Sequence, residues 1–246
     1  MKNHWHGKRD AAIRSFIRDL VPYGLAIRYA ARSERLRSEA FAAERSRALR
    51  LPAAVSGNTK RLPRLNMGCG SHLEPNWWNL DASEASDLQI WWDENATLPF
   101  EQDSLEIVFS EHFIEHISLN AGIHFCREAG RVLRPGGIFR CSTPNFDWIV
   151  NSANNNGWQK LMRVYEQIGD FPPGTLVHPS QVINWAFHGH GHQFIWSLAD
   201  FKDHLKAAGF RDIRQVRSGE TRLPGAAIEI RTSEEFCSLT VEATWH

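Results

Sequence analysis

The sequence predicts an α/β protein built on one sheet, because short apolar strands alternate along the chain with helical and turn segments. The first observation is an apolar strand around Leu65 that runs into Gly68-Cys69-Gly70 and is followed by a strand ending in Asp81. The second is a buried strand at 105–110, preceded by a polar turn. The third is a helix that stops at Pro and Gly residues and leads at once into a strand at 138–143.

The glycine turn is the most informative of these motifs. Two glycines one residue apart let the backbone turn sharply and approach a ligand where a Cβ atom would collide. The acid that closes the next strand, Asp81, can accept two hydrogen bonds from a ribose diol. Because Pro75 interrupts the short connection between the two strands, we expect a turn there rather than a full helix. The motif predicts that the sheet holds a nucleoside at the carboxyl ends of its strands.

Further motifs follow in order along the chain. They are Asn66-x-Gly68-Cys69-Gly70, Trp78-Asn79-Leu80-Asp81, Leu98-Pro99-Phe100, Glu115-His116, Leu133-Arg134-Pro135-Gly136-Gly137, Thr143-Pro144-Asn145, Gly191-His192-x-Phe194 and Ala208-Gly209-Phe210. In this order they resemble a class I S-adenosylmethionine (SAM) dependent methyltransferase, specifically the bacterial type 11 branch, whose members often accompany glycan and lipopolysaccharide biosynthesis. The resemblance covers roughly residues 60–246. The chain departs from the common pattern at Asn66 and His72, where an acid and a third glycine are usual.

The resemblance implies an enzyme with a Rossmann-like, seven-stranded methyltransferase sheet, completed by strands near 213–216 and 238–243, and SAM as the cofactor. It places Gly68 and Gly70 beneath the amino-acid part of SAM and Asp81 on the ribose. Asp93 would close an expected strand at 90–92 and lie near the adenine, with a plain strand-end cap as the alternative. Ser110 and Glu111 would face the transferable methyl group. The implied cofactor-binding residues are Asn66, Gly68, Cys69, Gly70, Asp81, Asp93 and Ser110.

Histidines supply the candidate catalytic groups. Methyl transfer is an in-line displacement, so positioning of the nucleophile can contribute about 7–11 kcal/mol. An alcohol nucleophile also benefits from a general base, worth about 10²- to 10⁴-fold in rate, and histidine suits that role at neutral pH. His112 and His116 are four positions apart, which predicts that they share one helical face beside Glu115. The candidate catalytic residues are His112, Glu115, His116 and His192.

A metal is the second option for the same residues. His112-x-x-Glu115-His116 matches the inverted zincin pattern, but the neighbouring strand and the Leu98-Pro99-Phe100 turn disfavour a metallopeptidase. The segment also resembles ubiquinone-pathway and small-RNA O-methyltransferases, in which Glu-x-x-Glu-His at this place binds a divalent ion. Here His112 stands in place of the first acid. We therefore favour SAM alone over SAM with a divalent metal, assign no metal ligands, and keep a packing role for His116 as an alternative.

The segment between the strand at 138–143 and the helix expected at 197–210 is rich in His and Trp. It spans about fifty residues, which is too long for an ordinary connection, so residues 145–195 are predicted to be an irregular lid over the substrate pocket. Flat aromatic faces could stack there on a sugar ring, although core packing is the favoured reading for each of them. These tryptophans are Trp158, Trp185 and Trp196.

The N-terminal part differs from the rest in charge. Residues 1–64 hold 15 Lys and Arg against 5 Asp and Glu, although the net charge of the chain is zero. Apolar residues at helical spacing predict a basic helical extension at 1–50, then a linker at 51–63 and a methyltransferase domain at 64–246. The extension could self-associate or pack on its own domain, or it could contact an anionic membrane surface, where each cation adds about 1 kcal/mol. Nucleic acid is the least favoured partner.

The predicted function is SAM-dependent methyl transfer, with O-methylation of a sugar or glycan precursor favoured. The alternatives are a methyltransferase acting on RNA or on a small aromatic metabolite, and a non-catalytic SAM-binding assembly protein. No apolar stretch approaches the roughly 20 residues of a spanning helix, and no cleavable leader is recognisable, so we expect a cytoplasmic protein with peripheral membrane contact as an option. The four cysteines form no Cys-x-x-Cys pair and are expected to fill the core.

Overall fold

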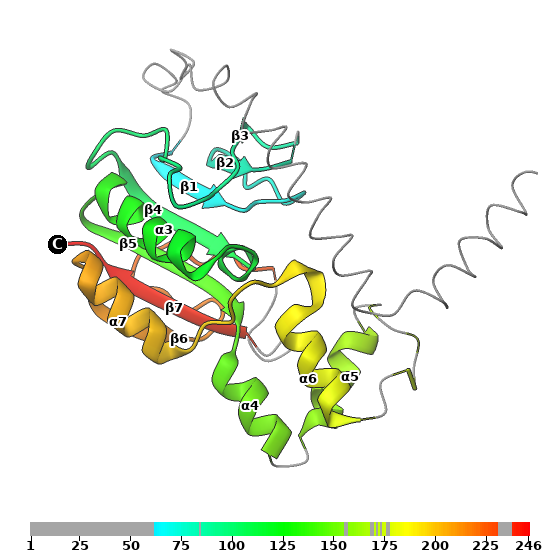
Figure 1. The fold of residues 1–246 in the computed structure, drawn as a ribbon. Coiled ribbons are helices and arrows are strands. Elements are labelled where there is room, and N and C mark those ends of the chain that lie inside the picture. The colour runs from blue at the N-terminus through cyan, green and yellow to red at the C-terminus, as the bar shows by residue number, and fades with distance from the viewer. Residues whose placement is uncertain are drawn as a thin grey trace, which may run out of the picture. The chain divides into compact units, whose positions relative to one another are not determined.

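The computed structural model describes residues 62–246, except 84, 155–156, 168–169, 171, 173, 176–177 and 231–237 (Figure 1). The predicted extension at 1–50 lies outside the described residues. So does the predicted linker, apart from its last two positions.

Seven strands form one sheet, in the order β3-β2-β1-β4-β5-β7-β6. The first five strands pair in parallel, and β7 lies antiparallel between β5 and β6. This is the predicted Rossmann-like methyltransferase sheet, which is confirmed. The strands are β1 (Arg64–Met67), β2 (Trp78–Asp81), β3 (Leu88–Gln89), β4 (Leu105–Glu111), β5 (Leu133–Pro144), β6 (Arg211–Val216) and β7 (Ser238–Thr244).

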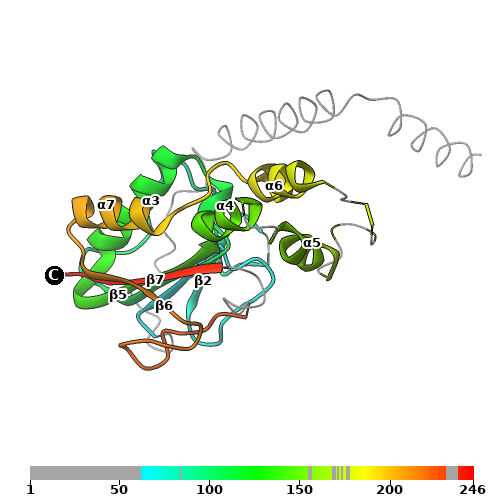
Figure 2. The ribbon, with the colours of Figure 1, turned by 90° about the horizontal axis from the view of Figure 1, so that it is seen from below.

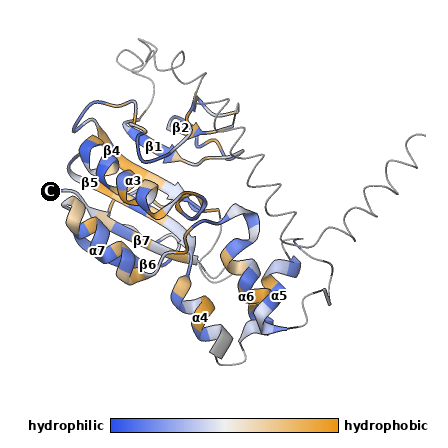
Figure 3. Ribbon diagram, in the orientation of Figure 1, coloured by the Kyte–Doolittle hydropathy of each residue, from blue (hydrophilic) through white to orange (hydrophobic). Residues whose placement is uncertain are grey.

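The central strands are apolar because they are covered on both faces. Figure 3 shows hydrophobic residues concentrated on β4 and β5. Six consecutive residues of β5, from Ile138 to Thr143, are buried, whereas residues 134–136 near the start of the strand are exposed. The buried stretch includes Arg140, Ser142 and Thr143 as well as apolar residues. The strand was predictable from the helix stop at Pro135-Gly136-Gly137 before it and from Pro144 after it.

Two helices cover one face of the sheet (Figure 2). α3 (Leu119–Val132) begins at Ser118, whose side chain accepts a hydrogen bond from the N–H of Ala121. α7 (Leu198–Ala208) begins with a capping box, in which Ser197 and Asp200 each bind the backbone N–H of the other. It ends at Gly209, whose φ of +109° only glycine adopts easily. The predicted helix at 197–210 is thus confirmed with its caps.

The motif Leu98-Pro99-Phe100 is held by the last turn of α3. Arg131 donates hydrogen bonds to the carbonyl oxygens of Leu98 and Phe100, both at 2.9 Å. Glu128 accepts from the N–H of Leu98 at 2.9 Å and from Arg131 at 2.8 Å. These hydrogen bonds therefore fix the turn to α3.

The opposite face of the sheet is covered, in the described part of the chain, by the segment at 217–230, which lies below the sheet in Figure 2. Its Ala226 packs with Ile107 and Phe109 of β4. A fully buried guanidinium, Arg140 of β5, anchors this segment. Arg140 pairs with Glu229, pairs with Glu242 of β7 at 3.0 Å, and donates to the carbonyl oxygens of residues 217 and 220.

Two sequence predictions fail in this part of the fold. The strand expected at 90–92 is wrong, because β3 comprises only Leu88–Gln89. After it the chain turns, so that Trp92 is buried and donates its indole N–H to the carbonyl oxygen of Ala121.

The lid expected to be irregular is helical. It contains α4 (Phe146–Asn154), α5 (Trp158–Gln167), α6 (Pro179–His188) and the 3-10 turn η2 (Gly189–Gly191).

These helices have an apolar cluster of their own, which explains why they form. Buried members come from each helix, namely Ile149, Leu161, Val182, Ala186 and Ile195, the last from the segment after η2. Each helix is only nine or ten residues long, and helices of that length depend on packing rather than on intrinsic propensity. We call residues 145–195 the insertion.

We expect Arg140→Met to lower the free energy of unfolding by about 3–5 kcal/mol, because it leaves two carboxylates buried without their cation. Urea denaturation measures the change. Arg134→Met on the same strand is the matched control. Arg134 is mostly exposed where it pairs with Glu106, so Arg134→Met should lower the free energy of unfolding by less than about 1 kcal/mol. Equal effects of the two substitutions would contradict the role given to Arg140.

We also expect acid sensitivity from Glu242. Burial raises its pKa, but hydrogen bonds from Thr221 and from the backbone of Arg222, with nearby positive charges, bring the pKa below the ordinary value of 4.5. A lowered pKa in the folded state stabilises the fold above pH 4.5, and this contribution is lost as the pH falls below that value. Glu242→Gln should therefore flatten the fall in unfolding free energy below pH 4.5. An unchanged slope in urea titrations would contradict this assignment.

Candidate active site

A cavity of about 550 Å³ lies at the carboxyl ends of β1, β2 and β4. Five of the seven predicted cofactor-binding residues line it: Asn66, Gly68, Cys69, Gly70 and Asp81. The wall also contains residues that the sequence analysis did not select, namely Ser71, His72, Leu73, Glu74, Phe109, Ile228 and Ile230. Ile228 and Ile230 come from the far end of the chain, so no local pattern could have shown that they reach this cavity.

The glycine loop bends as the sequence predicted. Gly68 and Gly70 both have positive φ, at +72° and +52°. A Cβ on Gly68 would lie 2.4 Å from the Cβ of Phe113, so the protein itself, not a ligand, excludes a side chain there. A Cβ on Gly70 would meet no protein atom within 4 Å. Gly70 is therefore the glycine at which an added methyl group would enter open space beside the cavity.

Two polar side chains hold the loop in place. Asp81 accepts hydrogen bonds from the N–H of Gly70 at 3.0 Å and from that of Ser83 at 2.7 Å. Asn66 donates to the carbonyl oxygen of His72 at 3.0 Å and to Asn79 at 3.1 Å. Each carboxylate oxygen can accept a second hydrogen bond. Binding of ribose by Asp81 and of the methionine part by Asn66 therefore stay predictions, beside a loop-positioning role that the sequence did not reveal.

Two predicted cofactor residues do not reach the cavity wall. Asp93 lies in a turn, where it accepts a hydrogen bond from the N–H of Asn95 at 2.8 Å. Ser110 is fully buried within β4. Its neighbour Glu111 does line the cavity and accepts a hydrogen bond from the N–H of Ile230 at 3.3 Å.

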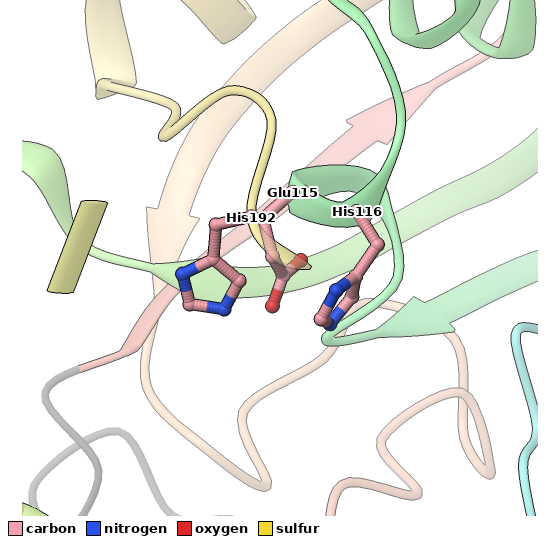
Figure 4. A group of neighbouring side chains, drawn as sticks. All are labelled: Glu115, His116 and His192. Carbon is pink, nitrogen blue, oxygen red and sulfur yellow. The ribbon is translucent and has the colours of Figure 1, made fainter. Parts of the chain in front are cut away.

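Three predicted catalytic residues come together at the same edge of the sheet. Glu115, His116 and His192 have carboxylate and imidazole atoms that all lie within 4.8 Å of one another. Figure 4 shows the Glu115 carboxylate between the two rings. Glu115 is completely buried in the 3-10 turn η1 (Ile114–His116) and accepts a hydrogen bond from Thr143 at 3.1 Å. We call these three residues the Glu–His cluster.

His112 is placed differently from the prediction. It precedes η1 and has a φ of +50°, so the expectation that it shares a helical face with His116 is wrong. Its Nδ1 lies 2.8 Å from Oε1 of Glu115, and its Nε2 lies 2.9 Å from the hydroxyl of Ser238. Because His112 also lines the cavity, it connects the cavity to the Glu–His cluster.

The charges in the cluster follow from these contacts. Burial raises the pKa of Glu115, but the imidazoles of His112 and His116 outweigh that effect and keep the pKa below its usual value. Burial lowers the pKa of His192 despite the hydrogen bond to Ala186. A carbonyl oxygen only accepts, so Nδ1 of His192, 2.9 Å from that of Ala186, is the donor. In the neutral ring, Nε2 then carries the free lone pair.

The aromatic and sulfur groups take mostly structural roles. Trp196 is fully buried beneath Gly122, so it cannot stack on a ligand. Trp185 is half-buried and donates its indole N–H to Asp170 at 2.9 Å.

Cys126 and Cys141 are completely buried, as expected of core fillers. Burial raises the pKa of Cys69 to about 12, so this thiol is neutral in the cavity wall.

Comparison with known families bears on the chemistry of this chain. Residues 65–141, less than half of the chain, match a family described as a methyltransferase domain. The match supports the predicted enzyme class, a methyltransferase. SAM as the cofactor stays a prediction. No curated protein matches the chain.

Solved structures with a similar course of the chain include three methyltransferases. A possible histamine N-methyltransferase from Thermotoga maritima is 15% identical, with 89% of this chain and 97% of that chain covered and a TM-score of 0.43. A SAM-dependent methyltransferase from Archaeoglobus fulgidus is 14% identical (75% and 87% covered, TM-score 0.43). Phosphoethanolamine N-methyltransferase 2 from Haemonchus contortus, in complex with SAM, is 15% identical (78% and 50% covered, TM-score 0.44). At these scores the similarities add nothing to the assignment.

None of the helices formed by the described residues is long and apolar enough to cross a membrane.

We expect Gly70→Ala to weaken SAM binding by at least about tenfold, or about 1.4 kcal/mol, because the new methyl group projects beside the cavity. Calorimetric titration with SAM measures the affinity. Gly136→Ala is the matched control, since Gly136 also has a positive φ and open space at its Cβ but does not line the cavity. If both variants bound SAM as the wild type does, the glycine loop would not be the cofactor site.

Proposed function

We propose that this methyltransferase transfers the methyl group of SAM to a hydroxyl oxygen of a sugar or glycan precursor. The single observation that carries the proposal is the Glu–His cluster joined through His112 to the cofactor cavity. Methylation of a hydroxyl requires loss of its proton, whereas the sulfonium of SAM needs no further activation. A cluster of this kind beside the methyl donor is what an oxygen acceptor requires.

The proposed chemistry divides between two parts of the site. The glycine loop, with Asn66, Cys69 and Asp81 in the cavity wall, holds the methyl donor. Ser110 and Asp93 do not reach that wall, so this proposal gives them no contact with the cofactor. The acceptor hydroxyl approaches from the side of the Glu–His cluster, where Nε2 of His192 has the free lone pair that can take the proton. The Glu115 carboxylate lies beside the resulting imidazolium and stabilises its charge. The oxygen then attacks the methyl carbon, and the sulfur takes the electrons of the broken bond.

The insertion is the proposed acceptor-selecting part. Its last segment carries His192, whose ring donates to the carbonyl oxygen of Ala186 in α6, and α4 and α5 pack against α6. Its half-buried indoles, Trp158 and Trp185, offer flat apolar faces of the kind that stack on sugar rings. We also propose that the protein acts in the cytoplasm, and that the basic residues 1–50 form a helical extension that mediates self-association or membrane contact.

The direct test has two stages. Purified full-length protein is first titrated with SAM and with S-adenosylhomocysteine. It is then incubated with methyl-labelled SAM and with sugars, aryl hydroxyl compounds or RNA in parallel. Label in an O-methyl sugar supports the proposal. Label only in RNA or only in an aromatic acceptor would move the assignment to that acceptor, and SAM binding without transfer to any acceptor would favour the assembly role.

We expect His192→Ala to reduce turnover by about 10²- to 10⁴-fold and to leave SAM affinity nearly unchanged, since His192 does not line the cofactor cavity. His190→Ala is the matched control. His190 is an exposed neighbour on η2 that pairs with Asp170, outside the Glu–His cluster. Measuring kcat and the Kd for SAM in both variants separates a role of His192 in turnover from a role in cofactor binding. Turnover equal to that of the wild type in His192→Ala would return this residue to a structural role.

A further inference from the structure

The Glu–His cluster is preorganised by the backbone on both sides. The N–H groups of Gln193 and Phe194 donate to the carbonyl oxygen of Glu115 at 2.7 and 3.3 Å. The side chain of Gln193 donates to the carbonyl oxygen of His116 at 2.6 Å. These hydrogen bonds join the insertion to η1 at the residues beside the cluster. The three side chains therefore meet because the two segments are fixed together, not through a chance approach of mobile groups.

Two of the three cluster residues, His192 and Glu115, have their other polar atom already engaged in a hydrogen bond. His192 uses Nδ1 on the carbonyl oxygen of Ala186, which leaves Nε2 for the cluster. Glu115 uses Oε2 on the hydroxyl of Thr143. Its Oε1 receives no well-aligned hydrogen bond from the described residues, although Nδ1 of His112 lies 2.8 Å away. Metal-binding imidazoles and carboxylates are commonly oriented by partners of this kind.

We propose that Glu115, His116 and His192 form a binding site for one divalent transition-metal ion. Two imidazole nitrogens and one carboxylate suit Zn²⁺, Co²⁺, Mn²⁺ or Fe²⁺, whereas Mg²⁺ prefers an all-oxygen set. Three protein ligands leave at least one coordination position open. His112 is not a ligand in this arrangement, because its two nitrogens lie against Glu115 and Ser238. It instead positions the carboxylate.

The inference rests on the proposed function in one respect, namely the use of the open position. An ion held by Glu115, His116 and His192 would supply Lewis acidity to an acceptor hydroxyl, whose proton would then leave to water while the oxygen kept the electron pair. Because the ion would engage the Nε2 lone pair of His192, this residue would act as a ligand rather than as the base when the site is loaded.

Direct binding measurements test the site without any acceptor. The full-length, untagged protein carries His4→Gln and His6→Gln, because these two histidines lie close together in the sequence and could bind metal themselves. After treatment with a chelator it is titrated with ZnCl₂ and CoCl₂ by calorimetry, and the visible absorption of Co²⁺ reports its coordination. We expect one ion per chain, and at least about 100-fold weaker binding in Glu115→Gln, His116→Ala and His192→Ala.

Two further variants separate a metal site from a merely structural cluster. Thr143→Val removes only the hydroxyl that orients Glu115, and it should weaken binding by about 10- to 100-fold. His190→Gln should leave binding unchanged. His116 and His192 are both partly exposed, so their alanine variants are expected to fold, which thermal unfolding checks.

The outcomes are decisive for the metal independently of the methyl transfer. Absence of saturable Zn²⁺ and Co²⁺ binding, or undiminished binding by a His116→Ala/His192→Ala double variant, overturns the site. SAM titration of the same preparations tells the two proposals apart. Intact SAM binding and transfer by a protein that shows no saturable metal binding would overturn the metal site alone, whereas stoichiometric metal binding without transfer to a hydroxyl acceptor would overturn only the proposed function.

Discussion

One wall of the cavity depends on a buried cation, the guanidinium of Arg140. Burial of a charge is costly unless the charge is paired and hydrogen-bonded, and Arg140 is bound by the carboxylates of Glu229 and Glu242 and by two backbone carbonyls. These partners fix the segment at 217–230 on a sheet face that no described helix covers. The same segment brings Ile228 and Ile230 to the cavity. A polar network in the interior thus shapes the wall of the cofactor site.

The donor and acceptor sides of the site meet because the strands end at one edge of the sheet. β4 ends at Glu111, and the left-handed backbone of His112 turns the chain sharply into η1. Non-glycine residues in this conformation are held there by their surroundings and concentrate at functional sites. At His112 the surroundings are Glu115 and Ser238, from the following turn and from the start of β7. The sharp turn is what brings a buried carboxylate within reach of the cavity.

Local sequence patterns were sufficient to predict much of this architecture. The Pro and Gly signals that flank β5, the glycine turn and the caps of α7 each depend on neighbours in sequence, so each could be predicted from the sequence. His112 could not be placed, because its contact with Ser238 joins residues 126 positions apart. The insertion was misread as irregular since its short helices become stable only when their apolar faces meet, as Leu161 and Val182 do. The prediction of a strand at 90–92 was wrong for a different reason. An apolar run at 90–92 looked like a strand, but Trp92 is buried against α3 instead.

The insertion and the sheet share the reactive centre, and this has a consequence for selectivity. Glu115 and His116 belong to the sheet edge, whereas His192 belongs to the insertion. If the insertion covers the acceptor, as proposed, it cannot move without separating the three converging groups. An acceptor that displaces the insertion would pull His192 from Glu115 and lose activation of its hydroxyl, even if it reached the methyl donor. Under the proposed function, discrimination would therefore arise in the transition state rather than in binding alone, because the hydrogen bonds from Gln193 to the backbone of Glu115 and His116 hold the insertion beside the cluster.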